Sequence, residues 1–301
     1  MPNWNDLLDE IRTTGSTHDY IRRKYLQRLH EVTGRNVIIY YSGWLQKPGI
    51  PRAGINDEDK IGFMTTINGL DRSKGLDLVL HTPGGDLAAT ESIVDYLREM
   101  FGTDIRAIIP QLALSAGTII ACACKSIVMG KQSSLGPIDP QFGSMPAHGV
   151  IEEFETAYKE IKQDPAKVYV WQPILSKYSP TLVGECKKAI EWAEELVKEW
   201  LVTGMFKDLA EREAKTLADK IVEELGDHAL TKSHARHISW RKCKEMGLKV
   251  ELMEDDQDFQ DAVLTVHHAC IHTFSHTSAF KIIENHLGKA YILNLPIAPP
   301  K

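Results

Sequence analysis

The sequence predicts an α/β fold that is built on parallel strands. Between residues 37 and 130, short apolar runs that suit strands alternate with stretches whose apolar residues recur at helical spacing. This alternation is typical of parallel strands that are connected by helices. One of the apolar runs, residues 76–80, stops abruptly at a Pro-Gly-Gly turn, which marks the end of a buried strand.

Four apolar runs are the expected strands of this sheet. The clearest consists of Val, Ile, Ile, Tyr and Tyr in a row, which are residue types that favour strands. The four expected strands cover residues 37–41, 76–80, 105–110 and 127–129. Helices are expected at residues 57–68, directly after the Pro-Gly-Gly turn, and over the Ala/Ile/Cys run at residues 119–124. A long loop, residues 42–56, contains several glycines and prolines, and we expect it to border the site.

The chain divides into three expected parts. Residues 1–33 are predicted to form an N-terminal helical arm, residues 34–252 the α/β domain, and residues 253–301 a C-terminal helical extension. Within the second part, helices are expected at 149–162, 182–205, 211–225 and 239–246, and a strand at 248–252. Residues 168–171 read as a short apolar segment, and residues 258–287 read as a histidine-rich helical region.

Composition excludes several classes of protein. The 301 residues are 43% hydrophobic and 25% charged, which is ordinary for a soluble globular protein. The net charge of −6 gives no electrostatic support for a nucleic-acid partner. Neither a secretory signal nor a run of about 18 apolar residues occurs, so we expect no transmembrane segment. The five cysteines lie in apolar or helical contexts, which favours free thiols and a cytoplasmic location.

Ser115 is the expected nucleophile. It lies in the sequence LSAGT, residues 114–118, between an expected strand and an expected helix. Its small neighbours would leave its Oγ exposed, and the N–H of Ala116 would lie at the positive end of the helix dipole. The arrangement follows the logic of a nucleophile elbow without the GxSxG spelling. The alternative is that Ser115 only caps the helix.

The Pro-Gly-Gly turn is the expected oxyanion hole. Glycines that follow a strand can turn backbone N–H groups outward, because no Cβ restricts their conformation. Such groups stabilise the negative oxygen of an acyl-transfer intermediate. We expect the N–H groups of Gly84 and Ala116 to form the hole, and Gly85 to let the chain approach the substrate. His81 precedes the turn and is expected to orient it rather than to act as a base.

Three segments, in this order, carry a resemblance to a known family. They are HTPGG (residues 81–85), LSAGT (114–118) and SLGPIDPQFG (134–143). Together they resemble serine peptidases of the Clp/crotonase superfamily, and most closely the serine dehydrogenase proteinase family, whose relatives include signal peptide peptidase A. The resemblance covers residues 37–251. It implies a spiral of ββα units with helical extensions at both ends.

The resemblance also implies an activity. A serine peptidase of this kind cleaves peptide or protein substrates through a Ser115 acyl-enzyme, needs no cofactor and assembles as a homo-oligomer. Two other functions stay open. The chain could be a catalytically silent scaffold that binds a partner through its helical extensions. It could also share the acyl-CoA chemistry of the superfamily, although a serine in the elbow argues against this.

The general base is where the sequence departs from the family. Peptidases of the superfamily activate the serine with a histidine that an aspartate orients, or with a deprotonated lysine. The turn that matches the position of the histidine contains Asp139 instead, and the position of the acid is Ala235, with His234 beside it. The two residue types therefore occur in exchanged places, and we expect Ser115, His234 and Asp139 to share one pocket. Alternatively, Asp139 caps a neighbouring helix and His234 is a surface residue.

A lysine is the alternative base. Lys177 is preferred among several lysines that follow Ser115 at a suitable distance, because its neighbours Tyr178 and Pro180 are apolar. A lysine base must be desolvated so that its pKa falls towards 7 or 8. A metal site is not expected. His268, His272 and His276 share one helix face at i, i+4 and i+8, but no cysteine or HExxH motif accompanies them.

Overall fold

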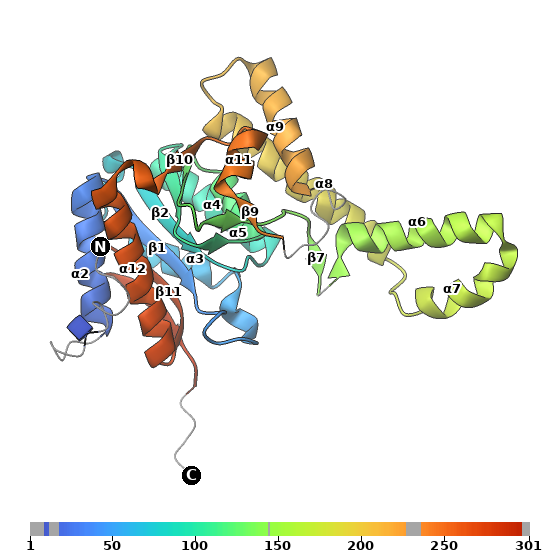
Figure 1. Ribbon diagram of the computed structural model, residues 1–301, viewed down its shortest axis with the longest axis horizontal. Helices are drawn as coiled ribbons and strands as arrows, with labels where there is room; N and C mark the ends of the chain where they lie inside the picture. Colours follow the sequence, from blue (N-terminus) through green and yellow to red (C-terminus); the bar gives the residue numbers. More distant parts are fainter. Residues whose placement is uncertain (1–8, 12–17, 144, 227–235, 297–301) are drawn as a thin grey trace, which may run out of the picture.

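A computed structural model describes residues 9–11, 18–143, 145–226 and 236–296, and it has an α/β architecture. Its centre is a seven-stranded mixed sheet with the strand order β10-β5-β3-β2-β1-β11-β12. The five strands from β10 to β1 are parallel, whereas β11 and β12 continue the sheet in antiparallel fashion. Helices cover both faces (Figure 1), as expected for a sheet with mostly parallel strands.

The strands of the central sheet are β1 (Asn36–Ser42), β2 (Leu76–His81), β3 (Ile105–Ile109), β5 (Ser126–Met129), β10 (Val250–Leu252), β11 (Ala279–Asn285) and β12 (Ala290–Asn294). Two small sheets consist of β4 (Leu112–Ala113), β6 (Ser134–Leu135) and β9 (Ile238–Ser239), and of β7 (Gln141–Phe142) and β8 (Met145–Pro146).

The α-helices are α2 (His18–Thr33), α3 (Asp59–Ile67), α4 (Leu87–Phe101), α5 (Ala116–Cys122), α6 (Ala147–Gln163), α7 (Val168–Leu175), α8 (Leu182–Trp200), α9 (Glu211–Gly226), α11 (Trp240–Met246) and α12 (Gln257–His276). A π-helical turn, Leu201–Met205, follows α8. Single 3₁₀ turns cover Pro51–Ala53, Arg72–Lys74, Pro165–Lys167 and Met253–Asp255.

The sheet separates two hydrophobic cores. On β1, Val37, Ile39 and Tyr41 point to one face, and Ile38 and Tyr40 to the other, because side chains alternate along a strand. The first face is covered by α2 and α12, which lie side by side (Figure 1). The second is covered by α3, α4, α5, α8 and α9. Burial on both faces explains why the central strands read as continuous apolar runs.

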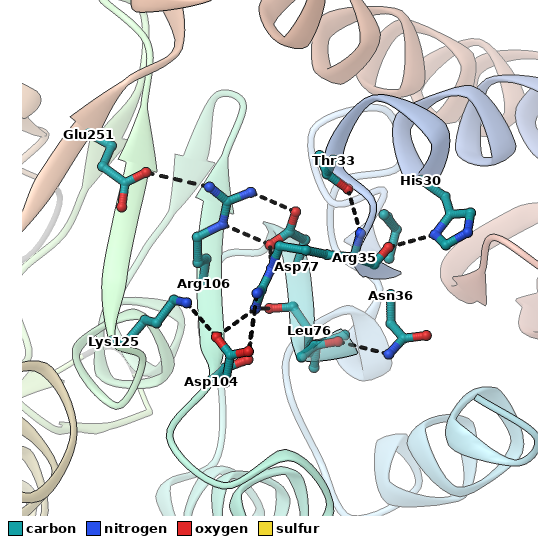
Figure 2. A network of polar contacts seen from close by, with 12 residues as sticks. His30, Thr33, Arg35, Asn36, Leu76, Asp77, Asp104, Arg106, Lys125 and Glu251 are labelled. Atoms are coloured by element: carbon teal, nitrogen blue, oxygen red, sulfur yellow. Dashed lines mark hydrogen bonds and ion pairs between the residues drawn. The ribbon is translucent and has the colours of Figure 1, made fainter. Parts of the chain in front are cut away.

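A network of ion pairs closes the amino ends of the parallel strands (Figure 2). Asp77, near the start of β2, is fully buried. Its Oδ1 accepts hydrogen bonds of 2.8 Å from the Nε atoms of Arg35 and Arg106, and its Oδ2 accepts one of 2.8 Å from Arg106 Nη2. Arg35 also donates to the carboxylate and the carbonyl oxygen of Asp104. One carboxylate therefore connects the starts of β1, β2 and β3.

A helical hairpin made of α6 and α7 projects away from the sheet (Figure 1). The apolar segment expected at residues 168–171 is part of α7, which contains a proline and has no buried residue. Its side chains Tyr169 and Val170 are 79% and 63% exposed. The hairpin is connected to the body through α8, against which α6 packs.

The expected helix at residues 258–287 is wrong in its second half. Helix α12 ends at His276, and the chain then forms the β11–β12 hairpin, with β11 beside β1. Strand β11 is fully buried along its length, and its polar members Lys281, Glu284 and Asn285 are paired inside the protein. The C-terminal part is thus a helix and two strands of the central sheet. The spiral of ββα units stays a prediction.

Within the described residues, no helix combines the length and the apolar character that crossing a bilayer requires.

Candidate active site

The site lies at the carboxyl ends of the parallel strands. After β2 ends at His81, Thr82 pairs with the short strand β4 through a parallel bridge to Ala113. The Thr82 N–H donates to the Leu112 carbonyl at 3.1 Å, and the Leu114 N–H donates to the Thr82 carbonyl at 3.0 Å. This pairing brings the Pro-Gly-Gly turn beside the segment that contains Ser115.

Ser115 is held in a strained backbone conformation immediately before α5. Its φ is 51° and its ψ is −117°, and it is the one non-glycine residue with positive φ in the described part of the chain. Such a conformation costs roughly 1–3 kcal/mol and must be imposed by the surrounding structure. The Ser115 side chain makes no hydrogen bond to the end of α5, so it does not cap that helix. The geometry is that of an elbow that presents a hydroxyl.

Three glycines explain how the chain can pack so closely around this elbow. A Cβ on Gly84, whose φ is +99°, would lie 2.7 Å from both the Ser115 Cβ and the Leu114 carbonyl oxygen. A Cβ on Gly117 would lie 2.5 Å from the Thr82 Cγ2, and one on Gly136 would lie 3.3 Å from the Ser115 N. The three segments that carry the family resemblance therefore meet at Ser115.

Thr118 connects two of these segments. Its Oγ1 accepts a hydrogen bond of 3.0 Å from the Gly136 N–H and lies within 3.0 Å of the Ala113 and Gly136 carbonyl oxygens. The residue is fully buried in the first turn of α5. It therefore fixes the turn at residues 136–140 relative to Ser115.

Two backbone N–H groups near Ser115 are available to a ligand. Ala116 is the first residue of α5, so its N–H has no partner inside the helix. The Gly85 N–H makes no hydrogen bond to another described residue, whereas the Gly84 N–H donates to the Thr82 Oγ1 at 3.2 Å. Gly85 lines the cavity described next, and Gly84 does not. The geometry thus favours Gly85 over the expected Gly84 as a donor.

A cavity of about 430 Å³ opens beside Ser115. Its walls are mostly apolar. The lining residues are Pro83, Gly85, Asp86, Leu87, Ser115, Ala116, Ile119, Ile138, Pro140, Gln141, Phe142, Gly143, Ala189, Trp192 and Ala193. Asp86 is the one ionisable residue among them, and its carboxylate already accepts a hydrogen bond of 2.8 Å from the Ala89 N–H at the start of α4. The cavity suits an extended chain with an apolar side chain.

The three residues expected to supply the base differ in their placement. Asp139 is buried between Ile138 and Pro140, both of which line the cavity. His234 lies outside the described residues. Lys177 is exposed in the segment between α7 and α8 and is not among the residues that line the cavity. No hydrogen bond connects the Ser115 Oγ to any side chain in the part of the chain that the structure describes.

His81, which was expected to orient the Pro-Gly-Gly turn, lies on the face of the sheet that α12 covers. His81 is fully buried, with ring centroids 4.4 Å from Trp44 and 5.2 Å from His267. Burial lowers the pKa of His81 to about 3, so the ring is neutral at physiological pH. His81 therefore packs behind the Pro-Gly-Gly turn. Among the described residues, no group of three or more His, Cys, Asp or Glu is suited to holding a metal ion.

Two further segments contribute to the site, and only the second was expected to do so. Ala189, Trp192 and Ala193 of α8 form one wall of the cavity, although the sequence indicated only that a helix covers these residues. Ile55, in the loop at residues 42–56, pairs with Gly85 through a parallel bridge. The loop thus does border the site, as its length and its glycines predicted.

Comparison with known proteins agrees with this geometry. The family model for ClpP-like SDH-type serine proteinases matches residues 14–260. Among curated proteins, the chain is 31% identical over 197 residues to Uncharacterized protein MJ1495 of Methanocaldococcus jannaschii, a match that covers 65% of this chain and 59% of the relative. It is 30% identical over 198 residues to Uncharacterized protein MJ0137 of the same organism, covering 65% and 60%.

The chain spans about three fifths of the length of these two curated relatives. The family match is broader, because it includes the elbow, the Pro-Gly-Gly turn, the turn at residues 136–140 and the segment that contains His234. The resemblance drawn from the three sequence segments is confirmed: the chain belongs to the family of ClpP-like SDH-type serine proteinases.

Proposed function

We propose that this protein is a serine peptidase that cleaves peptide bonds through a Ser115 acyl-enzyme. The observation that carries the proposal is the strained elbow, which faces a cavity together with two unbonded N–H groups, those of Gly85 and Ala116. Strain of this kind persists where the surrounding structure enforces it, commonly at catalytic sites. The family match supports the same activity.

In the proposed reaction, the Ser115 Oγ forms a bond to the substrate carbonyl carbon while a base takes the hydroxyl proton. The carbonyl oxygen becomes negative, and the N–H groups of Gly85 and Ala116 stabilise it. The intermediate then collapses: the C–N bond breaks, the amine leaves with the proton from the base, and an ester to Ser115 remains. Water hydrolyses this ester by the same sequence of proton transfers.

The proposed base is His234, with Asp139 orienting it. The burial of Asp139 between two cavity-lining residues supports this assignment, because a buried carboxylate beside the site can hold an imidazole in one tautomer. The alternative is Lys177, which is exposed in the single chain and would have to be desolvated by other parts of an assembly.

Substitutions and pH profiles separate the two bases. With His234 as base, activity rises with pH through roughly 6 to 7.5, and both His234→Ala and Asp139→Asn lose most of it. With Lys177 as base, the pH dependence of activity has a higher apparent pKa. Lys177→Ala is then inactive, while His234→Ala retains activity. Circular dichroism of each variant is the control for folding.

The decisive experiment for the proposal is labelling with a fluorophosphonate, which reacts with activated serines. We expect the wild-type protein to be labelled at Ser115, and Ser115→Ala to lose both labelling and several orders of magnitude in the rate of peptide hydrolysis. Thr118→Ser is a matched variant that keeps a hydroxyl in the first turn of α5 and is expected to remain labelled. Wild-type turnover in pure Ser115→Ala would contradict the proposal.

One observation favours a second function. Because no described side chain is hydrogen-bonded to the Ser115 Oγ, the chain could be a catalytically silent scaffold that uses the same cavity to bind a peptide. Labelling and binding measurements separate the two functions, because many active sites form their hydrogen bonds fully only when substrate is bound. Absence of labelling in every condition, together with peptide binding to the cavity, would favour the scaffold.

We further propose a homo-oligomer in a reducing, cytoplasmic compartment. The exposed apolar side chains of α7 support self-association, because leaving Tyr169 and Val170 in solvent is unfavourable. The five cysteines are free and buried, which supports a compartment that keeps thiols reduced.

A further inference from the structure

A fully buried lysine lies behind the Pro-Gly-Gly turn. Lys281, in the middle of β11, has no exposed surface, and its side chain points to the face of the sheet that carries α3. Its Nζ donates to the Asp59 Oδ1 at 2.8 Å and Oδ2 at 3.0 Å, and to the Gly54 carbonyl oxygen at 2.7 Å. Asp59 is also fully buried. A charged pair without access to water requires such complete hydrogen bonding.

The carboxylate of Asp59 accepts hydrogen bonds from two further donors. Its Oδ2 accepts a hydrogen bond of 2.7 Å from the hydroxyl of Tyr40, on β1, and one of 3.0 Å from the Asn56 N–H. The lysine and the aspartate therefore hold both ends of a three-residue segment, Gly54 through its carbonyl and Asn56 through its N–H. The residue between them is Ile55.

Ile55 makes the direct contact to the Pro-Gly-Gly turn. Its N–H donates to the Gly84 carbonyl at 2.8 Å, and its carbonyl accepts from the Asp86 N–H at 2.9 Å. The two backbones approach so closely that a Cβ on Gly85 would lie 2.2 Å from the Ile55 N. Both peptide groups that flank Gly85 are thus bonded to Ile55, and the direction of the Gly85 N–H follows from the position of the segment at residues 54–56.

The geometry points to Lys281 and Asp59 as positioning residues for the oxyanion hole. They contact neither Ser115 nor the cavity, but they fix Ile55, which fixes the turn that carries the Gly85 donor. Lys281 lies beyond the residues 14–260 that the family model matches, so the family match does not cover this part of the site. The inference rests on the proposed peptidase function for its catalytic consequence, and on geometry alone for the anchoring of the turn.

The test compares two buried ion pairs on the same strand. Lys281→Met/Asp59→Asn removes both charges, so no ion is left unpaired, and the amide oxygen can still accept from Tyr40 and Asn56. The matched control is Glu284→Gln, which disrupts the buried Arg22–Glu284 pair on the opposite face of β11. Both variants are expected to lose thermal stability, and only the first touches the segment at residues 54–56.

Two readouts follow the turn itself. Hydrogen exchange of the Ile55 and Asp86 amides, whose bonds join the segment to the turn, is expected to rise at least about tenfold in the double variant and to stay at the wild-type rate in Glu284→Gln. For a fluorogenic peptide substrate, kcat and the rate of Ser115 phosphonylation are expected to fall about tenfold to a hundredfold, with KM within about twofold. Glu284→Gln is expected to keep the wild-type kcat.

The outcomes are distinguishable. A folded double variant with wild-type exchange at these two amides and wild-type kcat overturns the inference, and so does faster exchange without any change in kcat. If the wild-type protein shows neither hydrolysis nor labelling of Ser115, the proposed function fails, and the exchange data then decide alone whether Lys281 anchors the turn.

Discussion

The two ends of the parallel strands are built on opposite physical principles. At the amino ends, buried Asp77 is paired with two arginines, and every charged group of the network has a partner (Figure 2). At the carboxyl ends, Ser115 is strained, and the N–H groups of Gly85 and Ala116 make no hydrogen bond to any residue that the structure describes. The polar groups at the amino edge are paired with one another, whereas those at the carboxyl edge are the ones to which we assign a role in the proposed function. The difference predicts that variants at the two edges will affect different measurements.

The largest expected effect is on kcat, which a substitution at the carboxyl edge of the sheet should lower and one at the amino edge should not. Gly84→Ala would place a Cβ 2.7 Å from the Ser115 Cβ and force the turn away from the elbow, so kcat is expected to fall about a hundredfold or more. Gly102→Ala is the matched control at the amino edge. Gly102 also has positive φ, +60°, but apart from its neighbours in the chain no atom lies within 4 Å of the position that a Cβ would take there. This control is expected to lose about 1–3 kcal/mol of stability, because alanine would be strained in this backbone conformation, and to keep its kcat.

A wild-type kcat in Gly84→Ala would show that the turn can shift without moving the oxyanion donors. The comparison needs peptide hydrolysis and urea unfolding for both variants, because each substitution also strains the backbone.

The next effect is on the free energy of unfolding, which a substitution at the amino edge should lower without changing kcat. Asp77→Asn leaves Arg35 and Arg106 without a buried carboxylate and is expected to lower the free energy of unfolding by about 2 kcal/mol, since both arginines remain partly exposed and can be solvated. The site is remote from this network, so kcat per folded molecule is expected to be unchanged. Urea unfolding and peptide hydrolysis measure the two quantities, and a parallel loss of kcat would show that the edges are coupled.

The last effect concerns pH, and its size depends on how far the solution is acidified. Burial lowers the pKa of His81 from 6.5 to about 3, so the unfolded chain takes up a proton below pH 6.5 that the folded protein excludes. This contribution to stability is complete above pH 6.5 and is lost as the pH falls towards 3, at about 1.4 kcal/mol per pH unit. Burial also lowers the pKa of His267, which packs against His81, well below its usual value.

The ion pairs at the amino ends of the strands should keep their contribution to stability to a lower pH than buried His81 does. Burial raises the pKa of Asp104, but hydrogen bonds from Arg35 and Lys125 outweigh it and hold that pKa at about 2. This contribution is present above about pH 4 and is lost as the pH falls through about 2. As the pH is lowered, amide hydrogen exchange behind the Pro-Gly-Gly turn is therefore expected to become faster at about pH 5. Exchange at residues 104–106 is expected to become faster only at a lower pH. His81→Phe should flatten the stability profile between about pH 6.5 and 4.5, and exposed His237→Gln should not.

The sequence predicted the elements that carry uninterrupted apolar runs. Strands β1, β2, β3 and β5 were expected within one or two residues of their bounds, because both of their faces are buried. The elbow at Ser115 was also predicted, since the small residues around it are needed where three segments meet. These features depend on local composition, which a single sequence displays.

Other features depend on contacts between distant residues. Strand β11 was expected to be helical, because buried Lys281, Glu284 and Asn285 interrupt its apolar pattern. Their partners lie more than 200 positions earlier in the chain. The choice between Gly84 and Gly85 as donor likewise depends on a hydrogen bond to the Thr82 Oγ1. The roles of His234, Asp139 and Lys177 stay predictions.

The position of Lys281 in the chain has a consequence during synthesis. Asp59 and the loop that supports the Pro-Gly-Gly turn leave the ribosome more than 200 residues before Lys281, which neutralises the Asp59 carboxylate. Until β11 pairs with β1, the carboxylate of Asp59 has no buried cation, and this segment cannot be enclosed without a large cost. Chains interrupted before residue 281 should therefore contain Ser115 and its neighbours but lack a fixed oxyanion turn. Under the proposed function, hydrolytic competence would then be acquired only after residue 281 has been made and β11 has paired with β1.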